Sequence, residues 1–283
     1  MKIKKVGVVG TGVMGSGITQ LCAMKGFETI MCGRSDASLN RALKDITNSL
    51  VKSYVAKGKM TEKDKDNIFA MIRTTKEIKD LADCDIMIEA IIENLKIKQD
   101  FFSNFEKACP NVSILASDTA GFSVTKIAEA TKRPERVVGI HLLSPVPQSR
   151  ALELIRPSYC TDEIFNAAKE FCTSLGKQVI VAKDTPGFII NRLLTPFVLG
   201  AARLYEEGVA TKEDIDNMMK LGAGHALGPI ELLDLAGLEN YCNLADHLYE
   251  ALKDKSYLVP DSMRQLVKEG HLGRKTKKGF YEW

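Results

Sequence analysis

Two residues of this chain could together carry a proton transfer, His141 and Glu153. His141 ends an apolar run and opens the loop HLLSPVPQ, and Glu153 lies in the apolar segment 151–155 just after it. A histidine titrates near neutral pH and can serve as general acid and base. A carboxylate among apolar residues is costly to bury without a partner. We predict a pair in which Glu153 fixes the imidazole tautomer and stabilises its protonated form, as hydride transfer at a carbinol carbon requires; the alternative is a structural histidine.

A glycine spacing near the start of the chain predicts where a nucleotide would bind. The apolar run 6–9 leads into Gly10-x-Gly12-x-x-Gly15, and a helical pattern follows at once. In a strand–turn–helix unit these glycines allow a tight turn, a close approach to a pyrophosphate and helix packing, and the helix N-terminus favours the negative charge. The alternative is a glycine-rich turn before an ordinary helix. The predicted cofactor contacts are Gly10, Gly12, Val13, Met14 and Gly15.

The tip of the second expected strand bears on which dinucleotide is bound. NAD-binding versions of this unit place an acid there, about 20 residues after the glycines, for the ribose 2′-hydroxyl. Here the strand 28–32 is followed by Gly33, Arg34 and Ser35, with no carboxylate at the tip. A guanidinium and a hydroxyl suit a 2′-phosphate, and Asp36 is interpreted as the N-cap of the next helix. The sequence therefore favours NADP(H) over NAD(H), unless Arg34 is only a surface charge.

The elements that must position these residues alternate between strands and helices in the first part of the chain. Strands are expected at 3–9, 28–32, 85–89, 113–116, 137–141, 152–155 and 178–181, and helices at 14–25, 37–57, 61–71, 96–108 and 162–175. Strands separated by helices favour parallel pairing. We predict an α/β fold with a Rossmann-like doubly wound sheet, and a helical hairpin inserted at about 37–71.

The pattern changes after Asp184, where strand-like runs stop. Helices are expected at 188–207, 212–221, 229–235 and 238–252. We therefore predict a dinucleotide-binding domain at 1–184 and an all-α C-terminal domain at 185–283 for substrate binding and dimerisation. Long apolar helices in such a domain often pair with a second copy, so a homodimer is expected.

Composition limits the classes of function. The chain has 283 residues, 45% hydrophobic and 27% charged, with a net charge of +3, which is too small to indicate nucleic-acid binding. No stretch approaches the roughly 20 apolar residues of a membrane span. The seven cysteines are scattered and never spaced C-x-x-C, which favours reduced thiols in the cytoplasm over disulfides or a metal site. Hydrolase, metallopeptidase and P-loop motifs are also missing from the sequence.

The chain also contains VGVVGTGVMGSGITQ, IEAIIENLKIKQ, ILASDTAGFSVTKIA and HLLSP, then DTPGFIINRLL, EDIDNMMKLGAG, LGPIELLDLAGL and LGRKTKKGFYEW. On these segments it resembles the short-chain L-3-hydroxyacyl-CoA dehydrogenases, the family that includes bacterial 3-hydroxybutyryl-CoA dehydrogenases, over essentially its full length. The resemblance implies reversible hydride transfer between a nicotinamide cofactor and C3 of a 3-hydroxyacyl or 3-oxoacyl thioester, with an acyl-CoA as substrate.

The same resemblance assigns roles to individual residues. His141 would be the catalytic base and Glu153 its partner, while Ser117 and Asn191 would hold the reacting oxygen; by itself Asn191 is more simply explained as an interhelical hydrogen bond. Glu93 and Lys98 would contact the cofactor. The helical hairpin would receive coenzyme A, with Ser49 and Lys57 as candidate contacts.

Three positions depart from the family pattern. The acid after the second strand is replaced by Gly33, Arg34 and Ser35, which supports NADP(H). Ser144 stands where the family has an asparagine, so it can still hydrogen-bond at the cofactor site but with a shorter reach. Asp118 stands where the family commonly has asparagine, and a carboxylate there could alter the histidine or the choice of substrate. Two other hypotheses therefore remain: the same chemistry on a non-thioester hydroxy acid or polyol, and a nucleotide-binding protein without turnover.

Overall fold

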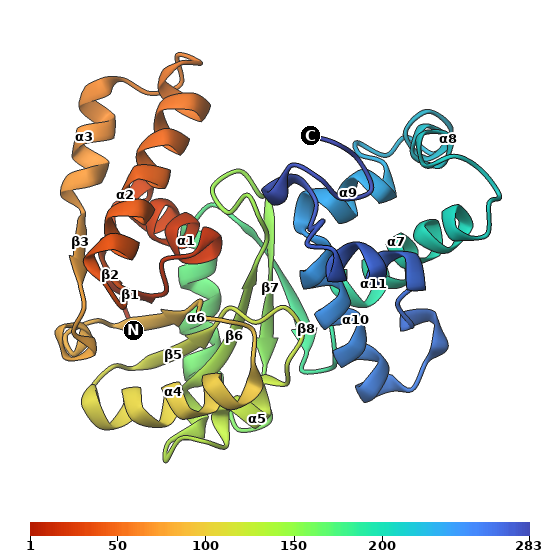
Figure 1. Ribbon diagram of the computed structural model, residues 1–283. Helices are drawn as coiled ribbons and strands as arrows, with labels where there is room; N and C mark the ends of the chain where they lie inside the picture. Colours follow the sequence, from red (N-terminus) through yellow and green to blue (C-terminus); the bar gives the residue numbers. More distant parts are fainter. The chain divides into compact units, whose positions relative to one another are not determined.

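The computed structural model describes residues 1–283, which divide into two compact units, 1–185 and 186–283 (Figure 1). The first unit contains one eight-stranded sheet in the order β3-β2-β1-β4-β5-β6-β7-β8. The strands are β1 Lys5–Val9, β2 Glu28–Cys32, β3 Ile72–Thr75, β4 Ile86–Glu89, β5 Ile114–Ser117, β6 Val137–Leu142, β7 Ala151–Arg156 and β8 Gln178–Lys183. This is the Rossmann-like doubly wound sheet that the sequence predicts.

One strand pair differs from the expected parallel pairing. All neighbours pair in parallel except β6 and β7, which are antiparallel. The reason is local, because only the loop 143–150 joins these strands and a parallel return needs a crossover of a dozen or more residues. The loop instead forms a wide hairpin, which places the strand of Glu153 directly beside the strand of His141.

The central strands are apolar because both faces of the sheet are covered. The helices of the first unit are α1 Val13–Met24, α2 Asp36–Leu50, α3 Glu62–Ala70, α4 Leu95–Ala108, α5 Val124–Ala128 and α6 Asp162–Ser174. Alternate side chains of the strands form one core with α1 and α6, including Ile88, Ile140 and Phe171. On the other face, Gly139 leaves room for α5, since a Cβ there would lie 2.7 Å from Cγ2 of Val124.

The inserted segment forms a helical hairpin of α2, a π-helical turn at Val51–Val55, and α3. Ser35, rather than Asp36, is the N-cap of α2, because its hydroxyl accepts the Ser38 amide proton at 3.2 Å. Asp36 is the first helical residue, where its charge favours the helix N-terminus and pairs with Lys76 at 2.7 Å. The interpretation of Asp36 as the cap was therefore wrong by one residue.

The second unit is helical, with α7 Ile190–Glu206, α8 Lys212–Asn217, α9 Pro229–Ala236, α10 Leu238–Leu252 and α11 Asp261–Lys268. Three short elements were not predicted from the sequence: α11 in this unit, and β3 and α5 in the first. Each has only four to eight residues, too few for a clear periodicity. None of the helices in the structure is both long enough and apolar enough to cross a membrane.

A buried carboxylate fastens the C-terminal segment to the second unit. Asp234 is 1% exposed and accepts hydrogen bonds from the amides of Phe280 and Tyr281 at 2.9 and 2.8 Å, and from Trp283 Nε1 at 3.0 Å. Without the Asp234 carboxylate, these main-chain and indole N–H groups would lose their acceptor. Asp234 therefore holds residues 280–283 against α9.

We expect Asp234→Ala to destabilise the second unit by about 2–4 kcal/mol, because it leaves the buried Phe280 amide and two partly buried donors without an acceptor. Urea unfolding followed by the fluorescence of Trp283, the single tryptophan, measures this. Asp246→Asn, which removes an exposed ion pair with Arg264, is the matched control and should leave the midpoint unchanged. Equal midpoints for the two variants would contradict the role of Asp234.

Candidate active site

The candidate site lies at the carboxyl ends of the parallel strands. Strand β2 lies on one side of β1 and β4 on the other. The direction in which successive strands are added to the sheet therefore reverses at β1. Ligands of open α/β sheets bind at such a reversal, beyond the carboxyl ends of the strands. Gly10 follows β1, Glu89 ends β4, Ser117 ends β5, and His141 is the next-to-last residue of β6.

Strand alternation places four polar side chains on one face of the sheet. Glu89 pairs with Ser117, Ser117 pairs with Gly139, and His141 pairs with Glu153. Paired residues of neighbouring strands point to the same face, and so do residues two apart in one strand. Glu89, Ser117, His141 and Glu153 therefore share the face that α5 covers.

His141 and Glu153 form the pair that their sequence context predicts. Nδ1 of His141 lies 2.7 Å from Oε2 of Glu153, and the two residues are 7% and 5% exposed. An ionised carboxylate can only accept a hydrogen bond, so we assign the proton of the neutral imidazole to Nδ1. Nε2 is then the nitrogen with a lone pair, and it is the atom that can take a proton.

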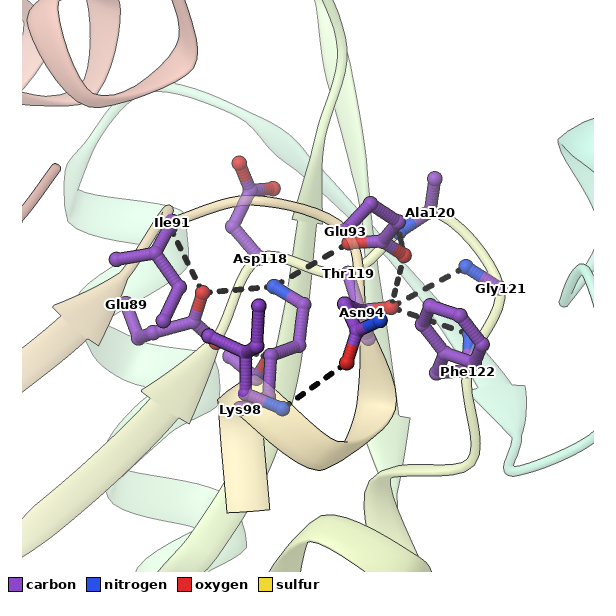
Figure 2. Close-up of polar contacts among 12 residues, drawn as sticks. Glu89, Ile91, Glu93, Asn94, Lys98, Asp118, Thr119, Ala120, Gly121 and Phe122 are labelled. Carbon is purple, nitrogen blue, oxygen red and sulfur yellow. Dashed lines mark hydrogen bonds and ion pairs between the residues drawn. The ribbon is translucent and has the colours of Figure 1, made fainter. Parts of the chain in front are cut away.

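A buried lysine connects the ends of three elements. Lys98 of α4 has no exposed surface, and its Nζ lies 2.7 Å from Oε1 of Glu89 and 3.2 Å from Oε2 of Glu93 (Figure 2). Burial alone would lower the pKa of Lys98, but the two carboxylates raise it above its ordinary value. Glu93 also accepts hydrogen bonds from Thr119 and from the amide of Ala120, at 2.8 Å for the latter. The network thus joins β4, α4 and the loop after β5.

Ser117 is held by the same network. Its hydroxyl donates to Oε2 of Glu89 at 2.7 Å, while Oε1 of Glu89 accepts from Lys98 and from the amide of Ile91. Ser117 and Glu89 have no exposed surface. Glu89 was not predicted as a site residue, although it is an acid at the end of an apolar strand, the same kind of signal that marked Glu153.

Asp118, which follows Ser117, is buried and close to His141. Its Oδ1 accepts the amide proton of Leu142 at 2.9 Å. Burial raises the pKa of Asp118 to about 7, which the nearby His141, the Leu142 amide and Lys98 partly oppose and Glu89 reinforces. A carboxyl group that titrates near neutral pH thus lies beside the histidine.

The glycine motif fits a dinucleotide phosphate. Gly10 has a φ of +126°, and a Cβ there would lie 2.3 Å from the carbonyl oxygen of Ala90. A Cβ at Gly15 would lie 2.1 Å from the carbonyl oxygen of Gly10, whereas nothing lies within 4 Å of the corresponding point at Gly12. No side chain caps α1 and its first turn, which begins Val13-Met14, has no acid. The N-terminal amides of α1 therefore present an uncapped site for an anion.

The tip of β2 has the residues that the sequence analysis singled out. Gly33 is buried, and a Cβ there would lie 2.6 Å from Cγ2 of Thr11. Arg34 and Ser35 are both exposed. The Ser35 oxygen accepts the Ser38 amide proton, so a hydroxyl proton remains that Ser35 can donate. The tip of β2 therefore has a guanidinium and a hydroxyl group, and Asp36 is the nearest acid along the chain.

A cavity of about 390 Å³ opens between α1, α2 and the loop after β6. Its lining includes Ser49 and Ser144, two of the predicted contacts, and also Lys52. Lys57 is exposed in the turn beyond and does not line this cavity. Lys57 follows Lys52 by five residues and lies past the π-helical turn at Val51–Val55.

The remaining predicted residue, Asn191, belongs to the second unit. It is the second residue of α7 and is half-buried. Within the first unit, the structure brings two sets of predicted residues together. His141 contacts Glu153. Ser117 and Lys98 both contact Glu89, and Lys98 also contacts Glu93.

Comparison with known proteins identifies the family. Residues 5–185 match the NAD-binding domain of 3-hydroxyacyl-CoA dehydrogenase, and residues 187–283 match its C-terminal domain. The chain belongs to the 3-hydroxyacyl-CoA dehydrogenase family. It is therefore an enzyme, an oxidoreductase whose first domain takes a nicotinamide cofactor.

Individual relatives and solved structures match nearly the whole chain. A 3-hydroxybutyryl-CoA dehydrogenase of Bradyrhizobium diazoefficiens is 41% identical over 99% of this chain and 96% of its own. The crystal structure of (S)-3-hydroxybutyryl-CoA dehydrogenase from Ralstonia eutropha has a TM-score of 0.90 and 38% identity, covering 100% of this chain and 99% of that one. A diketoreductase that acts on dicarbonyl compounds has a TM-score of 0.83 and 26% identity, covering 100% of both chains.

We expect Glu89→Gln to lower the free energy of unfolding by about 3 kcal/mol, because it removes the carboxylate nearest to a fully buried ammonium group. Urea denaturation measures the change. Asp100→Asn on the same helix α4 removes an exposed ion pair with Lys96 and serves as the control, with no expected change in midpoint. If Glu89→Gln unfolds at the same midpoint as this control, the Lys98 network does not stabilise the fold.

Proposed function

We propose that this protein catalyses reversible hydride transfer between NADP(H) and C3 of a short-chain 3-hydroxyacyl-CoA or 3-oxoacyl-CoA, with His141 as general acid and base. The observation that carries the proposal is the buried His141–Glu153 pair at the carboxyl edge of the sheet. This is the edge at which the glycine motif would hold the dinucleotide. Relatives named 3-hydroxybutyryl-CoA dehydrogenase support the short acyl chain.

The geometry of the pair supports the proton chemistry. In oxidation, Nε2 of His141 takes the proton of the C3 hydroxyl, and in reduction it returns that proton to the oxygen. Glu153 keeps the proton of the neutral imidazole on Nδ1 and faces the positive charge when the ring becomes doubly protonated. The hydride that leaves or enters C3 is the chemistry that the bound nicotinamide supplies.

Ser117 and Asn191 hold the reacting oxygen in this proposal. The side-chain amide of Asn191 offers an N–H donor, which stabilises charge developing on that oxygen. Ser117 would donate to the oxygen by turning its hydroxyl away from Glu89. The carboxylate of Glu89 would remain balanced by Lys98, so the turn leaves no uncompensated charge.

The cofactor is held by residues at the same edge. The glycine motif supports binding of the pyrophosphate, with the amides at the start of α1 as donors. Glu93 and Ser144 are the proposed contacts on the nicotinamide side, and Lys98, which has no exposed surface, would act there by holding Glu93. Arg34 and Ser35 are proposed to bind a 2′-phosphate, because a guanidinium matches phosphate oxygens and the tip of β2 has no acid to repel them.

The cavity beside α1 supports coenzyme A as the carrier of the acyl group. Ser49 lines it and Lys57 lies beyond it on the same hairpin, so a long ligand could reach both. Lys52, which also lines the cavity, adds a positive charge suited to a phosphate group. A non-thioester substrate is the second candidate, favoured by the altered Ser144 and by the likeness to the diketoreductase.

We expect the protein to oxidise reduced nicotinamide cofactor with acetoacetyl-CoA, and His141→Gln to lower kcat about a thousandfold because no other group takes its place as acid. Cofactor absorbance follows turnover, and calorimetry should show an unchanged Kd for the cofactor. His271→Gln, which alters a histidine in the second unit, is the control. Turnover of free acetoacetate but not of the thioester would favour the second candidate, and a fully active His141→Gln would overturn the mechanism.

We expect Arg34→Ala to raise the KM for NADPH by about tenfold to a hundredfold and to leave the KM for NADH nearly unchanged, because only NADPH has the 2′-phosphate. The measurement compares both cofactors at saturating acetoacetyl-CoA. Arg41→Ala removes an exposed arginine of α2 and controls for net charge. An equal effect of Arg34→Ala on both cofactors would contradict the role of Arg34 in binding the 2′-phosphate.

A further inference from the structure

The side chain of Asp118 takes over a hydrogen bond where the main-chain ladder stops. Strand β5 ends at Ser117, opposite Gly139, while β6 continues to Leu142. The Leu142 amide has no main-chain acceptor in β5, and Oδ1 of Asp118 accepts its proton at 2.9 Å. The carboxyl group thus extends the contact between β5 and β6 beyond the end of β5.

This hydrogen bond lies directly beside the histidine. The Leu142 nitrogen belongs to the peptide bond that follows His141, so Asp118 holds the main chain at His141 from the β5 side. Glu153 holds the imidazole from β7, on the other side of β6. His141 is therefore held between two carboxyl groups, one on its main chain and one on its ring.

Asp118 is also surrounded by groups that set its charge. The charges of His141 in β6 and Lys98 in α4 lower its pKa and that of Glu89 in β4 raises it, and the residue is 8% exposed. Figure 2 shows its side chain pointing away from the cluster around the Lys98 ammonium group, in which Glu89 and Glu93 are already paired. Burial raises the pKa of Asp118 to about 7, so it gains or loses a proton in the range where a histidine also does.

We propose that Asp118 is a positioning residue for His141, which anchors the main chain of the histidine and whose loss of a proton favours the protonated imidazole. The proposal rests on the proposed role of His141 as general acid and base. Above about pH 7 the ionised Asp118 attracts the positive ring that forms when His141 accepts the substrate proton. Below that pH the neutral carboxyl group keeps its hydrogen bond to Leu142 but contributes no charge.

The first experiment observes the two groups without substrate or turnover. Protein with carbon-13 at the aspartate carboxyl groups and histidine rings is titrated by NMR, and His141→Gln and Asp118→Asn assign the signals. We expect one aspartate carboxyl signal to titrate near pH 7, and the His141 signal to show an inflection at the same midpoint. Asp118→Asn keeps an oxygen acceptor for Leu142 and should remove this inflection. A His141 titration that is identical in wild type and Asp118→Asn would overturn the coupling.

The second experiment measures kcat/KM for oxidation of 3-hydroxybutyryl-CoA from pH 6 to 9. We expect the kcat/KM of Asp118→Asn to be about tenfold lower than that of wild type above pH 7 and equal to it below. The reason is that only the ionised Asp118 places a charge near the imidazole. Asp118→Ala, which also loses the anchor, should be slower at every pH. Asp85→Asn is the control, since Asp85 accepts the amides of Lys4 and Lys5 at the opposite edge of the sheet.

The outcomes separate this inference from the proposed function. An Asp118→Asn variant with the wild-type pH profile, or a profile change that Asp85→Asn shares, would overturn the role of Asp118. If His141→Gln keeps full activity, the proposed function fails instead, while the NMR titration still reports whether the two groups are coupled.

Discussion

The ammonium group of Lys98 has no contact with solvent, and its charge must be balanced by carboxylates within the protein. Glu89 supplies the nearest one, and in doing so it fixes α4 against the end of β4. The second oxygen of Glu89 accepts the hydroxyl proton of Ser117, and Glu93 binds the loop after β5. One buried ion pair thus sets the relative positions of three segments at the carboxyl edge of the sheet.

A second constraint comes from the antiparallel pairing of β6 and β7. If β7 ran parallel to β6, its carboxyl end would lie at this edge of the sheet. The residue opposite His141 would then be near the end of β7. The hairpin instead brings Glu153, the third residue of β7, directly opposite His141. Both side chains then lie on one face, close enough for a charge-assisted hydrogen bond once the ring is protonated. The proton chemistry that we propose depends on this reversal of strand direction as much as on the two residue types.

The sequence predicts those site residues that a pattern among neighbouring residues marks. Gly10, Gly12 and Gly15 are predictable because the steric need for glycine acts within a few residues. The acid of Glu153 stands out because its neighbours are apolar. Glu89 has the same signal, and its partner Lys98 is only nine residues away on the following helix. A lysine on a helix is usually exposed, so the sequence gives no sign that this one is buried against Glu89. Lys52 was missed although it continues the helical spacing of Asp45 and Ser49, which also line the cavity.

The sequence by itself determined the alternation of strands and helices, the glycine turn and the change to an all-helical second unit, because each follows from periodicity or from the conformational freedom of single residues. It also identified His141 and Glu153 as partners, since they flank one short loop. Only the tertiary structure decided that β7 runs antiparallel to β6, that Ser117 donates to Glu89, and that Asp118 anchors the peptide after His141. These facts join residues 24 to 28 positions apart, or depend on the direction in which a strand returns to the sheet. Local residue preferences carry no information about such pairings. They are decided when the sheet forms, because buried charges and main-chain groups must then find partners.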